Sequence, residues 1–236
     1  MGFDIGFMFV ALKAAIKYTP ITLIMSFASL VLGCIIGTFI ALTRVFQVKI
    51  LNRLSQVFVV IIKGIPIVLL ILILYFAVVQ SFDGLAEKFH WSLRAKDIPL
   101  IYIAIIALSL FASANISEAI RGALLAVDEG QYEAAYSAGL TTGQTLRRIV
   151  LPQALPVAVP MLCSSLIGLI KGSSLVFMIS VTDLMNAALI TATSNYKFLE
   201  AYVAAAIVYW VICIVIEKLS FILEKRLRIY SKGEVL

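Results

Sequence analysis

Charged side chains are scarce in this chain of 236 residues: they make up 14% of it, with 19 Lys and Arg against 13 Asp and Glu. A soluble globular domain carries about 25% charged residues, so this composition excludes that class. Apolar residues make up 62% of the chain, and the mean hydropathy is +1.07. These values predict an all-α integral membrane protein, because helices satisfy their own backbone hydrogen bonds inside a lipid bilayer.

Residues that carry out catalysis or bind metals are equally few. The chain has three cysteines, all in apolar segments and without the spacing of a metal site, and one histidine. The sequence has no phosphate-binding glycine loop and no nucleophile with a base nearby. We therefore expect no catalytic residue, no metal and no cofactor. We interpret the net charge of +6 as a topology signal and not as a nucleic-acid-binding surface.

Long apolar segments are what the sequence has in abundance. Four of them, 20–42, 57–79, 98–116 and 201–222, are long enough to cross about 30 Å of hydrocarbon as helices. A fifth apolar region, 154–191, is interrupted by the polar stretch 171–174. It is compatible with two short spans, or with one span over 154–177 followed by a partly inserted helix near 181–190.

The distribution of Lys and Arg favours one span in the fifth region. With one span, the N-terminus lies outside, while Arg147, Arg148 and the basic C-terminal segment lie inside with most of the basic residues. With two spans, one of these basic clusters falls on the wrong side of the membrane. The positive-inside rule therefore predicts five transmembrane helices with the C-terminus in the cytoplasm.

We expect a single membrane domain over residues 1–236. Residues 1–18 are predicted to form a helix on the outer interface that ends before Pro20. The alternative is that they are only the start of a long first helix. The membrane core is assigned to 19–222, including a polar loop over 128–152, and a cytoplasmic tail to 223–236.

The polar loop has a specific pattern. Residues 133–152 read EAAYSAGLTTGQTLRRIVLP and fit E-A-A-x3-G-x9-I-x-L-P at every fixed position. Gly139 is expected to end a first helix in a left-handed cap, and Thr141 or Thr142 to cap a second helix. In the second helix, apolar residues lie on one side and Arg147 and Arg148 on the other. Periodicity alone is also compatible with a solvated amphipathic loop that has no partner.

The pattern resembles the cytoplasmic coupling loop in the membrane-spanning subunits of bacterial ATP-binding-cassette (ABC) importers. Three further stretches are similar to motifs of the polar amino acid uptake branch of these type I permeases. K-G-I-P over 63–66 is similar to R-G-T-P, S-E-A-I-R-G over 117–122 to A-E-x-x-R-G, and K-G-S-S-L over 171–175 to K-D-T-S-L. The four matches follow the family order and cover most of the chain.

The resemblance implies a permease subunit in the bacterial inner membrane. Members of the family have five spans, work as homo- or heterodimers in the bilayer, and receive substrate from an extracytoplasmic amino acid-binding protein. ATP is hydrolysed by a separate ABC ATPase, which agrees with the absence of a phosphate-binding loop here. The residues implied in ATPase coupling are Glu133, Ala134, Ala135, Gly139, Arg147, Arg148, Ile149, Leu151 and Pro152.

Polar residues within the apolar segments, and the glycine and proline residues that break helices beside them, are candidates for the substrate path or a gate, because charges and broken helices at membrane depth usually border a cavity, a ligand or another protein segment. They are Lys63, Gly64, Pro66, Ser113, Asn115, Lys171, Gly172, Ser173 and Ser174. Glycine stands at 172, where many members have an acidic residue, which argues against selection of a basic side chain. K-G-S-S-L is more similar to the cystine branch, and other neutral polar amino acids stay open.

Each candidate has a structural alternative. Lys63 can extend to the lipid headgroups, and Ser113 and Asn115 can form interhelical hydrogen bonds. The competing functional class is an ion-coupled secondary transporter or channel without an ATPase. Such a protein needs carboxylates within the membrane, and we counted only Glu118 and Glu217, both at cytoplasmic span ends.

Overall fold

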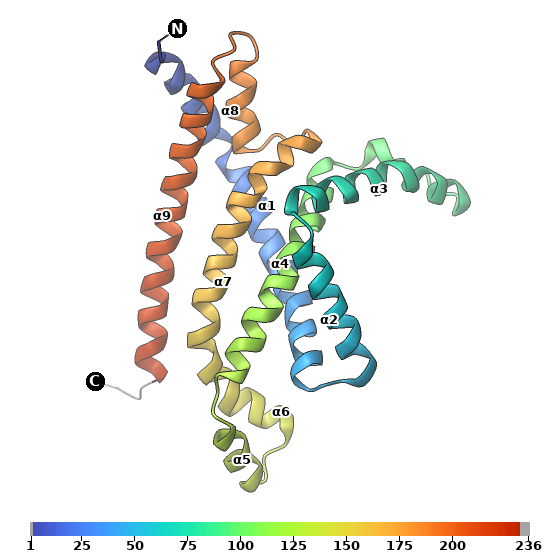
Figure 1. Cartoon of the computed structure of the whole chain (residues 1–236), viewed down its shortest axis with the longest axis vertical. Coiled ribbons are helices and arrows are strands. Elements are labelled where there is room, and N and C mark those ends of the chain that lie inside the picture. Colours follow the sequence, from blue (N-terminus) through green and yellow to red (C-terminus); the bar gives the residue numbers. More distant parts are fainter. Residues whose placement is uncertain (1, 232–236) are drawn as a thin grey trace.

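The computed structural model describes residues 2–231, and over that range the chain is helical without strands (Figure 1). The elements are α1 Ile5–Val45, α2 Lys49–Gly64, α3 Ile67–Lys88, η1 Ala95–Asp97, α4 Leu100–Leu125, α5 Glu129–Ser137, α6 Thr142–Thr145, a π-helical turn η2 Leu146–Val150, α7 Leu151–Ser173, η3 Ser174–Ile179, α8 Leu184–Ala192 and α9 Phe198–Ser231. Within the described range, five helical segments are long and apolar enough to cross a membrane, as predicted.

The first helix corrects the predicted boundary at Pro20. α1 runs without interruption from Ile5 to Val45, with Pro20 inside it. Ala11 and Ala15 are fully buried in clusters with residues of α8 and α9. Packing on those two helices holds the first turns in line with the rest of α1, so the loss of one backbone donor at Pro20 does not end the helix.

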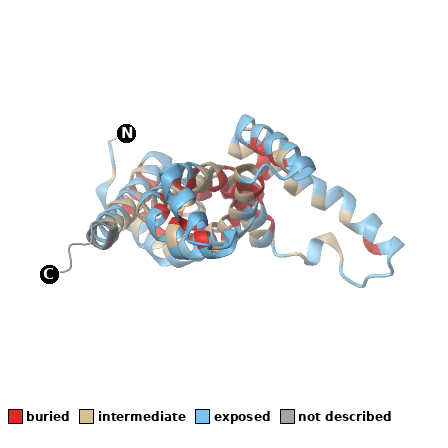
Figure 2. Cartoon of the chain, turned by 90° about the horizontal axis from the view of Figure 1, so that it is seen from below, coloured by how far each residue is buried: buried red, intermediate tan, exposed pale blue. Residues whose placement is uncertain are grey.

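The second predicted span is also wrong in its bounds. The chain breaks at Ile65 and Pro66, which separates α2 from α3, so the apolar helix is Ile67–Lys88 and not 57–79. The bend itself is expected from Gly64 and Pro66. α3 leaves the bundle and projects to the right in Figure 1, and Figure 2 shows this arm to be mostly exposed.

The region 154–191 folds as one span followed by a short helix, which confirms that prediction. α7 ends at Ser173, the turn η3 follows, and α8 starts at Leu184. α9 continues to Ser231, so the predicted tail over 223–236 starts as part of this helix. Residues 232–236 lie outside the described residues.

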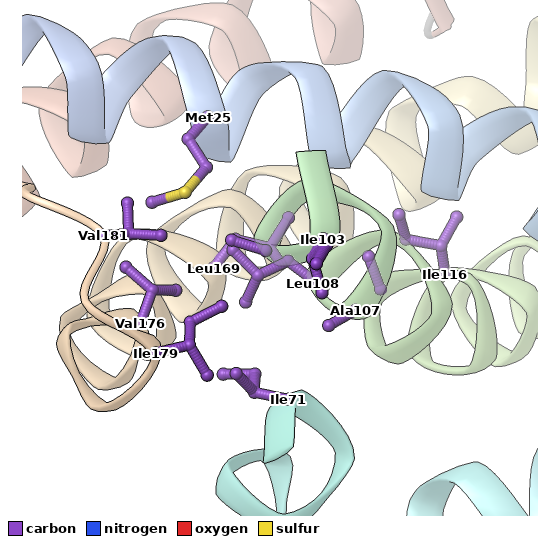
Figure 3. Close-up of a cluster of buried hydrophobic side chains, with 12 residues drawn as sticks. Met25, Ile71, Ile103, Ala107, Leu108, Ile116, Leu169, Val176, Ile179 and Val181 are labelled. Carbon is purple, nitrogen blue, oxygen red and sulfur yellow. The ribbon is translucent and has the colours of Figure 1, made fainter. Parts of the chain in front are cut away.

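The core lies where α1, α4 and α7 meet the start of α3 and the turn η3 (Figure 3). The small-residue face of α1 allows this close packing. A Cβ added to Gly33 would lie 2.6 Å from the Cβ of Ala112, and one added to Gly37 would lie 2.8 Å from the carbonyl oxygen of Ser113. The two helix backbones therefore approach each other as in other close membrane helix pairs.

The two ends of the bundle differ. α5 and α6 extend beyond α4 and α7 at the end where α9 also finishes, while the N-terminus and α8 lie at the opposite end (Figure 1). The polar loop and the end of α9 are thus on one side, and the start of α1 is on the other.

Candidate functional site

The loop over 128–152 folds as the sequence predicts. The carboxylate of Asp128 accepts a hydrogen bond of 2.8 Å from the backbone N–H of Gly130 and so caps α5. After α5, Gly139 adopts the left-handed conformation with φ of 79°. Thr141 caps α6, and a reciprocal bond of 2.9 Å runs from its own N–H to Oε1 of Gln144. Local capping therefore fixes a helix–turn–helix unit.

One side of this loop packs against the ends of α4 and α7. Val150 is fully buried in a cluster with Ala123, Leu124, Val127, Ala154 and Ala158. The hydroxyl of Tyr132 donates a hydrogen bond of 3.3 Å to the carbonyl of Leu124, and burial raises the pKa of that hydroxyl. These contacts attach the loop firmly to the bundle.

The other side of the loop is exposed. It presents Glu133, Ala134, Gly139, Arg147, Arg148, Leu151 and Pro152, whereas Ile149 is half-buried and Ala135 is buried. Within the described part of the chain, neither Glu133 nor either arginine forms an ion pair. Small residues and unpaired charges of both signs on a rigid, exposed unit are suited to docking another protein.

A cavity of about 320 Å³, lined mostly by apolar surface with a few polar side chains, lies between α4 and α7. Its lining consists of Phe111, Ala112, Asn115, Ser164, Ser165, Gly168 and Leu169. The amide nitrogen of Asn115 donates a hydrogen bond of 3.0 Å to the carbonyl of Phe111. The hydroxyl of Ser165 donates a hydrogen bond of 2.9 Å to the carbonyl of Met161. The cavity therefore offers an amide oxygen and serine hydroxyls to a polar ligand.

Lys171 lies on the same face of α7 as this cavity. Ser164, Gly168 and Lys171 are all exposed and are spaced by four and three residues, which places them in one row along the helix. Across residues 2–231, Lys171 has no acidic partner within ion-pair distance. The row thus combines a hydroxyl, a glycine and an ammonium group on a mainly apolar helix.

The remaining residues of the 171–174 motif point elsewhere. A Cβ added to Gly172 would lie 2.9 Å from Cδ1 of Ile67, so this glycine packs against the start of α3. Ser173 is fully buried, with its hydroxyl donating 2.8 Å to the carbonyl of Ile170. The hydroxyl of Ser174 donates 2.6 Å to the carbonyl of Lys171. Of the four residues, Lys171 is the one that shares the row of Ser164 and Gly168.

Ser113, Lys63, Gly64 and Pro66 do not line the cavity. Ser113 is fully buried, donates to the carbonyl of Leu110, and faces the glycine surface of α1. The other three are exposed at the junction of α2 and α3. That junction contacts the 171–174 motif through Ile67 and Gly172, so two motifs about a hundred residues apart meet at this point.

Sequence reasoning missed several residues. Ser164 and Gly168 could have been found by stepping back along the helix from Lys171. Asp183 was left out of our count of membrane carboxylates, yet it is fully buried. Its Oδ1 accepts 2.9 Å from the N–H of Asn186, and its Oδ2 accepts 3.2 Å from the hydroxyl of Tyr209. Asp183 therefore caps α8 and also binds α9.

A hollow of about 840 Å³ lies at the end opposite the loop. It is lined by Gly2, Phe3, Asp4, Ile5, Asn195, Tyr196, Lys197, Leu199 and Glu200. Asp4 forms an ion pair with Lys197, which lowers the pKa of the Asp4 carboxyl, and the N–H of Asp4 donates 3.0 Å to Glu200. This surface joins the start of α1 to the α8–α9 connection.

Comparisons with known proteins cover almost the whole chain. Residues 33–229 match the family described as binding-protein-dependent transport system inner membrane component. The probable amino-acid ABC transporter permease protein PatM of Vibrio harveyi is 34% identical, over 96% of this chain and 97% of that protein. The L-cystine transport system permease protein TcyL of Bacillus subtilis is 33% identical, over 89% and 86%. A crystal structure of an amino acid ABC transporter with histidines superimposes with a TM-score of 0.79, at 28% identity over 96% of this chain and all of that one.

Proposed function

Because the chain belongs to the family of binding-protein-dependent transport system inner membrane components, as a permease subunit of an amino-acid ABC importer, we propose that it moves a neutral polar amino acid such as cystine into the cytoplasm. The observation that carries this proposal is the pairing of an exposed loop of the coupling-loop pattern with a cavity between α4 and α7 that contains Asn115, Ser164 and Ser165. The loop receives motion from an ATPase, and the cavity lies on the substrate path.

The exposed face of the loop supports the coupling role. Glu133 and the arginine pair supply charges for orientation, while Ala134 lets a partner backbone approach closely. Gly139 sets the angle between α5 and the following turns. The firm attachment of this unit to α4 and α7 means that a displacement of the loop displaces both helices that border the cavity.

The lining of the cavity supports a neutral, zwitterionic substrate. Among the described residues, the lining contains no carboxylate, so a basic side chain would find no counter-charge there. Lys171, one helical turn beyond Gly168, is positioned to attract the substrate carboxylate. Asn115, Ser164 and Ser165 then offer hydrogen bonds to polar groups of the substrate. We therefore assign recognition of the substrate charge to Lys171, in its row with Ser164 and Gly168, and not to Gly172.

The partners follow from the same scheme. A second permease subunit, identical or different, completes the pathway in the bilayer, an ABC ATPase docks on the loop, and a binding protein delivers substrate at the other end. The loop and the end of α9 lie at the same end of the bundle, opposite the N-terminus, which supports an N-outside, C-inside orientation in the inner membrane (Figure 1).

Ion-coupled transport without an ATPase is the alternative, and buried Asp183 is the observation that bears on it. Its carboxylate caps α8 and accepts a bond from Tyr209, and it does not line the cavity between α4 and α7. These contacts support a structural role for the carboxylate rather than the role of an ion carrier.

The test is co-purification from cells that also express an ABC ATPase and an amino acid-binding protein from the same genome. A tagged chain should retain the ATPase. In a version of the chain without its three native cysteines, a membrane-impermeant thiol reagent applied to intact cells should label Ser194→Cys but not Ser137→Cys. Absence of the ATPase from the purified complex, or labelling of Ser137→Cys from outside, would contradict the proposal.

A further inference from the structure

Arg44, near the end of α1, forms an ion pair with Glu118 of α4. The distance from Nη1 of Arg44 to Oε1 of Glu118 is 2.5 Å. The second carboxylate oxygen of Glu118 accepts from Nε and Nη2 of Arg121, at 3.1 and 2.9 Å. Arg44 and Glu118 are 15% and 27% exposed, so water screens this pair less than a surface pair. One carboxylate thus links α1 to the last turns of α4.

Apolar contacts join the same two helices at the base of the loop. Leu42 and Val45 of α1 pack against the cluster that contains Val127 and Val150. Further along, α1 and α4 meet through Gly33 and Gly37 almost backbone to backbone. In the middle of this interface, the hydroxyl of Ser29 in α1 donates a hydrogen bond of 3.2 Å to the carbonyl of Ile105 in α4. The ion pair is the directional contact between the two helices at the end that carries the loop, and there it fixes their axial register.

The opposite half of α1 is tied to α8 and α9. The N–H of Leu184 donates 3.1 Å to the hydroxyl of Thr22, and both residues are fully buried. Ala11 and Ala15 pack among residues of α8 and α9. With 41 residues, α1 is about 60 Å long. It therefore reaches from the base of the loop to the far end of the bundle.

We propose that α1 carries displacement of the coupling loop to α8 and α9, and that Glu118 is the positioning residue that joins α1 to the loop through Arg44. The inference rests on the proposed function, which supplies both the ATPase that drives the loop and the cystine whose uptake is measured. Without the ion pair, the end of α1 would follow the loop less closely than α4 does, and ATP hydrolysis would continue with less transport.

The test is a charge-swap cycle in the complete transporter, reconstituted in liposomes with its ATPase and binding protein. The variants are Arg44→Glu, Glu118→Arg and the double variant, with Glu118→Gln as a milder change. Arg53→Glu is the matched control, because Arg53 is exposed on α2 and forms no ion pair among the described residues. For each variant we would measure radiolabelled cystine taken up per ATP hydrolysed, the amount of ATPase retained, and the midpoint of thermal unfolding.

Each single reversal should lower uptake per ATP by about fivefold or more, the lower end of coupling between two sites. ATPase retention should stay at the wild-type level, and the double variant should recover to within about twofold of the wild type because the attraction is restored. Arg53→Glu should leave the ratio unchanged. A wild-type ratio in the single variants, or a double variant no better than either single one, overturns this inference alone. Failure of the wild-type chain to retain ATPase overturns the proposed function as well.

Discussion

The hydroxyl of Tyr209 in α9 donates a hydrogen bond of 3.2 Å to the carboxylate of Asp183, which is fully buried at the start of α8. The same carboxylate caps α8 through the N–H of Asn186. A buried acceptor with two donors holds two helices in one geometry, because leaving either donor unpaired in an apolar interior is costly.

Replacement of Asp183 should therefore destabilise the protein. Asp183→Ala leaves the Tyr209 hydroxyl and the Asn186 N–H without an acceptor and should cost about 2–4 kcal/mol of unfolding free energy. Asp183→Asn retains a capping oxygen and should cost less, and Tyr209→Phe about 1 kcal/mol. Thermal unfolding in detergent measures these changes. Tyr202→Phe is the matched control, because Tyr202 is exposed. Equal unfolding midpoints for Asp183→Ala and wild type would refute the structural role.

Lys171 and Gly172 should behave differently although they are adjacent. Lys171→Ala should lower cystine uptake at least fivefold without changing thermal stability, because Lys171 is exposed on the cavity face and contributes little to packing. Gly172→Ala should lower stability by about 1–3 kcal/mol, since its new Cβ would lie 2.9 Å from Ile67. Adding Ile67→Val to the Gly172→Ala variant should restore part of the lost stability, because it removes the methyl group that the new Cβ would meet.

Gly168→Ala is the control for the second change, because no heavy atom lies within 4 Å of its added Cβ. The account of this region fails if Gly172→Ala is as stable as Gly168→Ala while Lys171→Ala transports normally.

The coupling loop should depend on Glu133 and on the backbone of Gly139. Glu133→Lys reverses an exposed charge and should weaken ATPase binding by about tenfold or more. Gly139→Val forces a β-branched residue to φ of 79°, which costs about 1–3 kcal/mol and changes the loop. Both should lower substrate-stimulated ATP hydrolysis while the permease remains in the membrane. Gly143→Val, in open space, should have little effect. Normal coupling in Glu133→Lys and Gly139→Val would rule out this docking surface.

The contact between Asp4 and Lys197 should be lost only in acid. Lys197 lowers the pKa of the Asp4 carboxyl in the folded protein. The contact therefore contributes stability above the ordinary carboxyl pKa of about 3.9, and loses it as the pH falls through the lower folded value. Protection of the Phe7 N–H, which donates to Asp4, should persist from pH 7 to 5 in hydrogen exchange. Loss of protection within that range, or equal protection in Asp4→Ala, which has no side-chain oxygen to accept from Phe7, would contradict the assignment.

Much of the fold follows from local sequence. The five spans, the left-handed Gly139 and the small face with Gly33 and Gly37 depend on residues close together in the chain. Tertiary contacts decided the rest. Packing on α8 and α9 keeps α1 helical through Pro20, although proline disfavours the interior of a helix. Arg44 and Glu118 are 74 residues apart, and no local pattern pairs them.

The candidate site divides in the same way. The loop residues were predictable, because capping and amphipathicity determine which of their side chains are exposed. The cavity was not, because it forms between α4 and α7 and depends on which face of each helix is turned inward. Asn115 was among the candidates, whereas Ser164, Ser165 and Gly168 carried no motif.

The most direct test of the central claim is uptake of radiolabelled cystine into liposomes that contain this chain, its ATPase and ATP, with the binding protein outside. The account predicts uptake that requires ATP, persists when ionophores collapse all ion gradients, and is competed by neutral polar amino acids but not by arginine or lysine. Uptake driven by an ion gradient without ATP, or competed best by arginine, would contradict it.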